Sequence, residues 1–153
     1  MARAHREQKA NRLAADDLRE RLRASNTAKQ FGFVLDKAEA GHVILEMPVD
    51  ERHKQIHGVV HGGVIAALAD TAGGLATYMA CARGTRVATI EMKINYLEAV
   101  SSGTVRAEAR VVRLGTHIAV VDCDVRDETR RLVGKALMTF FVSALDEKRT
   151  RKR

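Results

Sequence analysis

A single carboxylate, Asp70, stands in the middle of an apolar stretch that runs from His61 to Arg83. The composition of this stretch predicts one long helix that is apolar almost all round, and such helices are normally buried. An ionised carboxylate in apolar surroundings costs free energy unless it is paired, hydrated or used in chemistry. The first question about this chain is therefore what Asp70 does.

The predicted helix has two unlike faces at the helical period. One face is bulky and the other is small, with Asp70 near the centre of the small face. The bulky face carries Val64, Ile65, Leu68, Leu75, Tyr78 and Met79, and the small face carries Gly63, Ala66, Asp70, Gly73, Gly74, Thr77 and Cys81. A glycine inside a helix costs about 1 kcal/mol relative to alanine. We expect this cost to be offset by the close approach of another part of the protein or of a ligand to the small face. The pattern alone leaves open whether Asp70 is bonded structurally or used in function.

The start of the predicted helix is a second candidate for chemistry, because His61, Gly62 and Gly63 stand there. The first N–H groups of a helix lack internal partners and lie at the positive end of its dipole. Two glycines let a ligand oxygen approach those amides, as the carbonyl of a thioester under attack would. Asp70 lies at least two turns further on, so a dimer is the simplest way to bring it to the amide of another chain.

A metal site is the alternative use of these residues. His53, His57 and His61 are spaced by four, as ligands on one helix face would be. Gly58, Gly62 and Gly63 argue against a helix there, and no carboxylate or cysteine set lies nearby, so we expect no metal. His61 by itself fits a structural role in the loop as well as a catalytic role.

The surrounding elements follow from hydrophobic periodicity and turn residues. We expect a polar surface helix over Asn11–Gln30 whose sparse apolar stripe is Leu13, Leu18, Leu22 and Ala28. Two short strands precede the long helix, at Phe31–Leu35 and His42–Val49, and four follow it, at Arg86–Leu97, Gly103–Leu114, Thr116–Arg126 and Leu132–Ala144.

The first strand after the long helix shows the alternation of a half-buried strand, with one face formed by Ala88, Ile90, Met92, Ile94 and Tyr96. Short joints between the later strands favour antiparallel neighbours. The predicted fold class is therefore α+β, with one long helix wrapped by a curved antiparallel sheet. Because such a sheet has exposed edges that can pair with a copy of itself, we expect a dimer.

The chain of 153 residues suits one domain, and its net charge of +7 is uneven. The excess of basic residues lies in residues 1–29 and 147–153, whereas the remainder is nearly neutral. We expect a basic tail and surface helix over 1–30, a single domain over 31–146 and a basic tail over 147–153. No aromatic residues interleave with these charges, so nucleic-acid binding is not expected as the main role.

The N-terminus lacks the apolar core of a signal peptide, and Cys81 and Cys123 lie inside apolar segments without activating neighbours. Residues 62–82 are long enough to span a bilayer, but Asp70 and four glycines favour a buried helix. We therefore expect a cytoplasmic protein with reduced cysteines and no membrane partner.

The stretch HGVVHGGVIAALADTAGG resembles the signature of the hotdog-fold acyl-CoA thioesterases, and in particular the branch of phenylacetic-acid-degradation thioesterases. The likeness extends from about Phe31 to Ala144 and includes ATIEMKINYLEAV and RLGTHIAVVDCDVRD. It implies a hotdog fold, homodimers that often form tetramers, and active sites at the dimer interface. With this likeness, the glycines of the small face are expected to admit a partner chain and a thioester. Apart from coenzyme A as part of the substrate, it implies no cofactor.

The resemblance also assigns roles to residues. Asp70 would be the general base or a nucleophile that forms a mixed anhydride, and the Gly62 N–H would polarise the thioester carbonyl. Gln55 stands where many relatives have asparagine, Thr89 matches a serine or threonine position, and Gly74 replaces a hydroxyl residue found in some relatives. Gln55, His61 and Thr89 would orient the reactants. The residues expected to contact the substrate are Gly63, Thr89, Glu91 and Arg113, the last at the phosphates of coenzyme A.

The resulting hypothesis is hydrolysis of an aryl- or medium-chain acyl-CoA. Two rival hypotheses are left open by the sequence. One is an acyl-CoA-binding regulator without catalysis, although such proteins usually carry a DNA-binding domain for which the N-terminal 30 residues are short. The other is a hotdog hydratase, but those relatives place a histidine where this chain has Leu75.

Overall fold

The structure is a computed structural model that describes residues 14–144. Expectations for the two basic tails and for Leu13 therefore lie outside the described residues. The elements in chain order are α2 (Ala15–Ala24), α3 (Asn26–Phe31), β1 (Val34–Glu39), β2 (His42–Pro48), the short 3₁₀-helix η1 (Glu51–His53), α4 (Gly62–Ala80), β3 (Thr85–Tyr96), β4 (Thr104–Leu114), β5 (Ile118–Arg126) and β6 (Leu132–Ala144).

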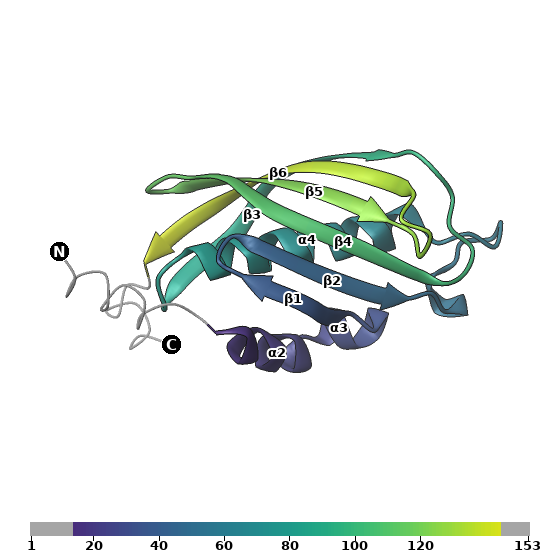
Figure 1. Cartoon of the computed structure of the whole chain (residues 1–153), viewed down its shortest axis with the longest axis horizontal. Coiled ribbons are helices and arrows are strands. Elements are labelled where there is room, and N and C mark those ends of the chain that lie inside the picture. The colour runs from purple at the N-terminus through teal and green to yellow at the C-terminus, as the bar shows by residue number, and fades with distance from the viewer. Residues whose placement is uncertain (1–13, 145–153) are drawn as a thin grey trace.

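One curved, antiparallel sheet wraps around the long helix α4, as Figure 1 shows. The strand order is β1-β2-β4-β5-β6-β3, so β1 and β3 are the two edge strands. The helix packs against strands from across this sheet, and α2 packs against β1. This arrangement confirms the predicted α+β hotdog architecture with an extra N-terminal helix.

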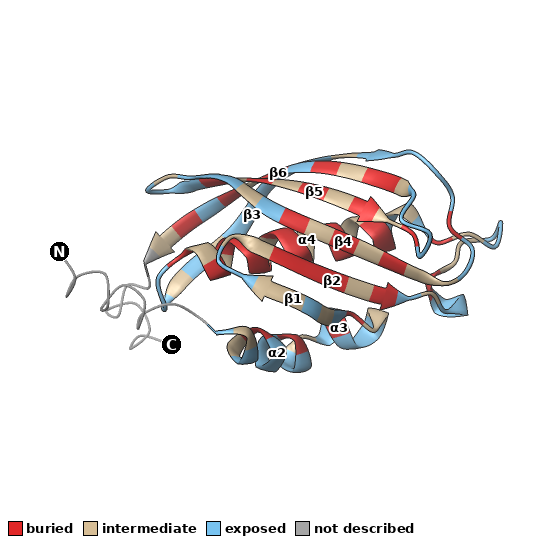
Figure 2. Cartoon of the chain, viewed as in Figure 1, coloured by how far each residue is buried: buried red, intermediate tan, exposed pale blue. Residues whose placement is uncertain are grey.

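The core lies between α4 and the concave face of the sheet, where the buried residues in Figure 2 gather. In α4, Leu68, Ala69, Ala72 and Ala76 are fully buried, and each strand facing them contributes alternate apolar side chains. By length and composition α4 would be able to cross a membrane, but more than half of it is buried inside the fold. Burial of its apolar surface by the sheet accounts for this composition.

Not every glycine of the small face leaves room for a partner chain or a thioester. A Cβ built on Gly73 would lie 2.6 Å from the Met138 methyl carbon and 3.0 Å from the Phe140 ring, so β6 of the same chain occupies this approach. The prediction that a partner chain and a thioester enter along these glycines is therefore wrong for Gly73. Gly74 has more room, with its nearest contact to Phe140 at 3.7 Å.

The strands after α4 are confirmed with shifts of at most two residues at their ends. The N-terminal elements need correction. The single predicted helix is broken at Ser25, whose hydroxyl accepts the Ala28 N–H at 3.2 Å and caps a separate helix, α3. Helix α3 includes Phe31 and ends at Gly32, whose φ of 67° is in the left-handed region. The predicted first strand therefore exists, but it begins at Val34 and not at Phe31, and it runs to Glu39 as β1.

Strand β3 also departs from simple alternation, because its pairing with β6 contains a bulge. Thr89 pairs with Phe140 and Glu91 pairs with Thr139, which leaves Ile90 as the extra residue. An extra residue reverses the facing of every later side chain. Thr89 therefore faces α4 together with Met92, which corrects the expectation that Ala88 and Ile90 share the inner face.

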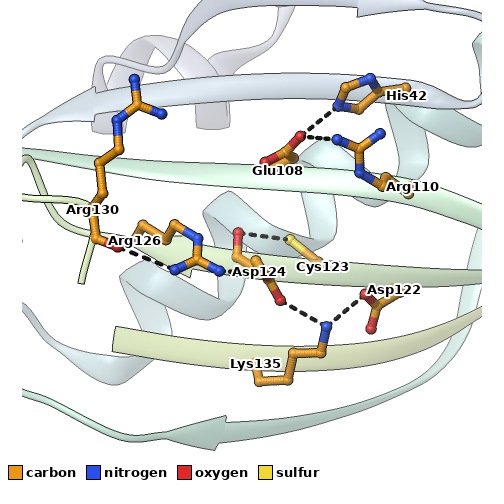
Figure 3. A network of polar contacts seen from close by, with 9 residues as sticks. All are labelled: His42, Glu108, Arg110, Asp122, Cys123, Asp124, Arg126, Arg130 and Lys135. Carbon is orange, nitrogen blue, oxygen red and sulfur yellow. Dashed lines mark hydrogen bonds and ion pairs between the residues drawn. The ribbon is translucent and has the colours of Figure 1, made fainter. Parts of the chain in front are cut away.

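The outer, convex face of the sheet carries a network of charged side chains, drawn in Figure 3. The Lys135 ammonium donates to Asp122 at 2.6 Å and to Asp124 at 2.7 Å, while His42 contacts Glu108 at 2.8 Å. Cys123 lies between the two aspartates in sequence and is fully buried, so its side chain faces the core. The network is thus separated from α4 by the thickness of the sheet.

Candidate active site

Asp70 and Thr89 meet between the middle of α4 and the bulge of β3. The Thr89 hydroxyl donates to Asp70 Oδ1 at 2.8 Å, so these two predicted site residues are brought together. Among the described residues no hydrogen bond reaches Oδ2 of Asp70, and the side chain is half-buried. The carboxylate is therefore oriented through one oxygen, and the other oxygen is left for a water molecule or a substrate.

The start of α4 distinguishes the two glycines that follow His61. His61 is the N-cap of α4, and its Nδ1 accepts the Gly63 N–H at 2.8 Å. The Gly62 N–H, in contrast, donates to no acceptor within residues 14–144. The helix thus presents one N–H at its positive end, and this amide belongs to Gly62.

Tyr96 covers Gly62 from the end of β3. A Cβ built on Gly62 would lie 3.1 Å from the Tyr96 ring, closer than most real contacts of that kind. A larger residue at position 62 would therefore push Tyr96 aside. The close ring explains why a glycine suits this position even though its backbone is ordinary helix.

His53 holds the loop before α4 in place. It is fully buried, its Nδ1 accepts the Asp50 N–H at 3.0 Å, and its carbonyl accepts the His61 N–H at 2.8 Å. Burial, reinforced by the positive charge of Arg52, lowers the pKa of His53 and favours the neutral ring. In the described part of the chain, no three His, Cys, Asp or Glu side chains form a group that would suit a metal ion.

Gln55 lies in the turn between η1 and α4. Its side-chain oxygen accepts the His57 N–H at 3.4 Å, and its backbone is tied to Val59 and Gly58. No hydrogen bond in the described residues joins Gln55 to Asp70. The neighbouring Ile56 is 95% exposed, so this turn projects into solvent in the single chain.

The remaining predicted residues lie away from the pair of Asp70 and Thr89. Glu91 is exposed and pairs across the sheet with Thr139, so the bulge turns it to the outer face. Arg113 is exposed at a second bulge, near the end of β4. Within one chain the structure therefore does not join these two side chains to the carboxylate.

A cavity of about 240 Å³ adjoins Asp70. It is lined by α4, β3, β6 and, unexpectedly, by α2; the residues are Arg21, Leu22, Ser25, Asp70, Thr71, Gly74, Leu75, Tyr78, Val87, Thr89 and Phe140. The wall formed by α2 was not predicted from the sequence. The only signal was the apolar stripe containing Leu22, which indicates docking but does not indicate where.

The two cysteines do not provide a nucleophile for this site. Both are free and buried. Burial raises the pKa of the Cys81 thiol, and burial together with the nearby carboxylates of Asp124 and Asp122 raises the pKa of Cys123 to about 12. Neither thiol forms a useful amount of thiolate near neutral pH. The nucleophilic chemistry of the site therefore rests on its oxygen groups.

Solved structures similar to this chain include several thioesterases. The chain superposes on a thioesterase of Haemophilus influenzae with a TM-score of 0.81 and 32% identity, covering 88% of this chain and 94% of that one. It also resembles a hypothetical thioesterase of Streptococcus pneumoniae in complex with coenzyme A, with a TM-score of 0.71 and 28% identity over 76% of this chain and 90% of that one.

Comparison of sequences also finds thioester hydrolases. A proofreading thioesterase, EntH, of Klebsiella pneumoniae is 39% identical over 65% of this chain and 73% of its own length. The 1,4-dihydroxy-2-naphthoyl-CoA hydrolase of Escherichia coli is 32% identical over 78% of this chain and 90% of its own length. The model of the thioesterase superfamily matches residues 57–134, which include α4 and both partners of the Asp70–Thr89 hydrogen bond. The chain therefore belongs to the thioesterase superfamily and is a thioester hydrolase.

Proposed function

We propose that the protein hydrolyses an aryl- or medium-chain acyl-CoA to the free acid and coenzyme A, with Asp70 and Gly62 as the central groups. The observation that carries this proposal is the hydrogen bond from Thr89 to Asp70, which fixes a carboxylate beside a cavity. A carboxylate that is held in one orientation can act as a general base or as a nucleophile.

Either route begins with attack on the thioester carbonyl carbon. As a general base, Asp70 takes a proton from water while the water oxygen bonds to that carbon. As a nucleophile, its own oxygen bonds there and forms a mixed anhydride that water then hydrolyses. In both routes the carbon–sulfur bond breaks, the electron pair leaves with sulfur, and the coenzyme A thiolate is protonated. The carbonyl oxygen gains negative charge, which a helix N-terminal N–H stabilises.

The second central group, the Gly62 N–H, lies too far from Asp70 to serve the same carbonyl within one chain. Eight residues separate them on α4, which corresponds to about 12 Å along the helix axis. A second copy of the chain resolves this distance, with Asp70 from one protomer and Gly62 from the other. The free edge of β3 supports such pairing, because Ile90 on this edge strand is 55% exposed. The proposed assembly is thus a homodimer, which pairs further into a homotetramer.

The other predicted residues take supporting roles in this proposal. His61 holds the Gly63 amide and so orients the helix start, while Gln55 and Gly63 flank the reacting groups from the partner's side. Glu91 and Arg113 meet the coenzyme A part of the substrate across the assembly, with Arg113 at its phosphates. No metal or redox group is required for these steps.

The comparisons support an acyl-CoA substrate. One relative is named for hydrolysing an aromatic acyl-CoA, and one structural neighbour holds coenzyme A. Together with the likeness to the phenylacetic-acid-degradation branch, they make aryl-CoA esters the first substrates to test. We also propose that the protein acts in the cytoplasm, where acyl-CoA esters and reduced thiols are found.

The test is a panel of aryl- and fatty-acyl-CoAs, followed by release of the free thiol. We expect Asp70→Asn to lower kcat by about 10²–10⁴-fold, the range typical for loss of a general base. Asp36→Asn serves as a matched control, because this carboxylate lies on β1, the opposite edge strand, where it pairs with Arg106. Equal rates for wild type and Asp70→Asn would contradict the role of Asp70. Saturable binding of acyl-CoA without turnover would instead support a binding protein.

A further inference from the structure

The cavity beside Asp70 is elongated along α4. Asp70, Gly74 and Tyr78 all line it, and residues four apart in a helix lie on one face. The cavity therefore follows α4 from the carboxylate toward the C-terminal end, over about 12 Å for eight residues. This direction leads away from Gly62 and the start of the helix.

The middle of the cavity is apolar. Leu22, Leu75 and Phe140 are buried residues that line it, and Val87 adds a half-buried aliphatic wall. The pantetheine arm of coenzyme A carries amides that need hydrogen-bond partners, so this lining suits the acyl group better. A thioester with its carbonyl at Asp70 would then extend its acyl group along α4 toward Tyr78.

The far end of the cavity is cationic. The guanidinium of Arg21, from α2, lies over the Tyr78 ring at 4.4 Å from its centroid. No carboxylate of the described residues lies within 4.0 Å of the Arg21 nitrogens, whereas the nearby Arg19 and Arg83 pair with Asp16 and Asp17. The N–H donors of a guanidinium lie in its own plane, so a guanidinium held over a ring can still bind an oxygen.

A second donor lies beside Arg21. Ser25 also lines the cavity, and its hydroxyl oxygen accepts the Ala28 N–H at 3.2 Å. Its O–H hydrogen is therefore able to point toward a ligand. A cavity with an apolar middle and donors at its far end matches a ligand with an apolar body and an oxygen at its tip.

We propose that Arg21 determines specificity by selecting acyl groups that carry a distal carboxylate. This inference rests on the proposed acyl-CoA hydrolysis. The apolar part of the acyl group fills the cavity along α4, and its terminal carboxylate binds the guanidinium that Tyr78 holds in place. Arg21 acts on recognition of the acyl group and takes no part in the bond-breaking step.

The experiment compares adipyl-, suberyl- and sebacyl-CoA with the fatty acyl-CoAs of equal chain length, for wild type, Arg21→Gln and Arg23→Gln. Arg23 is the matched control, because it is an exposed arginine of α2 outside this cavity. We expect wild type to favour at least one carboxylate-ended ester by about tenfold in kcat/KM, as a hydrogen bond to a charged group gives. Arg21→Gln should remove this preference and leave the methyl-ended partner nearly unchanged, and Arg23→Gln should keep it.

The outcomes separate this inference from the function on which it rests. If both kinds of ester are hydrolysed and Arg21→Gln has the same preference as wild type, Arg21 is not the selector, although acyl-CoA hydrolysis stands. If wild type hydrolyses no acyl-CoA, the proposed function itself is overturned, and with it the proposed role of Arg21. A loss of preference in Arg23→Gln equal to the loss in Arg21→Gln would also overturn the inference, because general charge would then be the cause.

Discussion

Thr89 donates its hydroxyl hydrogen to Oδ1 of Asp70 at 2.8 Å, across the boundary between β3 and α4. The contact exists because the bulge at Ile90 lets Thr89 and Met92, on opposite sides of the bulge, both face the helix. Without the extra residue, one of the two would face outward. A local irregularity of an edge strand therefore orients the only carboxylate of α4.

Replacing Thr89 by valine removes the hydrogen bond and keeps the size and branching of the side chain. We expect kcat of Thr89→Val to fall by about 10–100-fold, because a hydrogen bond to a charged group contributes about 1.5–3 kcal/mol. Thr89→Ser, which keeps the hydroxyl, should retain most of the activity. Steady-state kinetics on the best acyl-CoA checks both variants. If Thr89→Val kept the activity and Thr89→Ser lost it, packing of the methyl group, and not the hydrogen bond, would be what matters.

The Gly62 N–H can be deleted without breaking the helix. Gly62 is the first residue of α4, where proline is well tolerated, and His61 before it has φ −63° and ψ 133°, the extended conformation that proline requires of its neighbour. Loss of one oxyanion donor typically lowers kcat by about 10²–10³-fold, and we expect this for Gly62→Pro.

The matched control for this variant is Gly62→Ala. Both substitutions add a Cβ that lies about 3.1 Å from the Tyr96 ring, but alanine keeps the N–H. Kinetics of the two variants therefore separates the steric effect from the loss of the donor. If Gly62→Ala is as inactive as Gly62→Pro, displacement of Tyr96 is the cause and the amide has no demonstrated role.

Complementation tests whether Asp70 and Gly62 act from different chains. A heterodimer of Asp70→Asn and Gly62→Pro chains contains one site with both groups intact and one site that lacks both. Co-expression with two affinity tags isolates this species, and we expect it to recover about half of the wild-type activity per dimer. Each homodimer should stay nearly inactive. No recovery in the doubly tagged species would mean that the two groups belong to one chain's site, and an active Gly62→Pro homodimer would mean that the amide is not used.

Long periodic elements were predictable from the sequence, and local interruptions were not. The pattern from Gly62 to Ala80 and the four later strands are confirmed because burial enforces their periods over many residues. The alternation from Ala88 to Tyr96 is unbroken in the sequence, so nothing in it marks Ile90 as the bulged residue. That bulge depends on pairing with β6, which is a tertiary property.

The candidate site was also predictable only in part. Asp70 stood out because a charge in an apolar helix needs a reason, and Thr89 was matched to it through a family pattern. The wall formed by Arg21 and Ser25 was not predictable, because it depends on where α2 docks. The break at Ser25 has a signal in the sequence, because serine is a favoured N-cap residue, but the sparse apolar stripe on both sides of it predicts one helix.

The stability of the fold should depend on pH through His53. Burial lowers the pKa of His53 below its ordinary value of 6.5, so in acid the unfolded chain binds a proton that the folded chain rejects. This contribution is fully present above about pH 6.5 and is lost as the pH falls toward the lower pKa of the folded state. Between the two pKa values the free energy of unfolding should fall by at most about 1.4 kcal/mol for each pH unit. Urea unfolding of wild type between about pH 5 and 7 measures the slope.

A matched pair of variants assigns that slope to His53. His53→Gln should flatten the dependence of unfolding free energy on pH, whatever its absolute stability, because the titrating group is gone. His57→Gln should keep the wild-type slope, because His57 is exposed in the neighbouring turn. A slope that persists in His53→Gln would show that other groups govern the acid sensitivity.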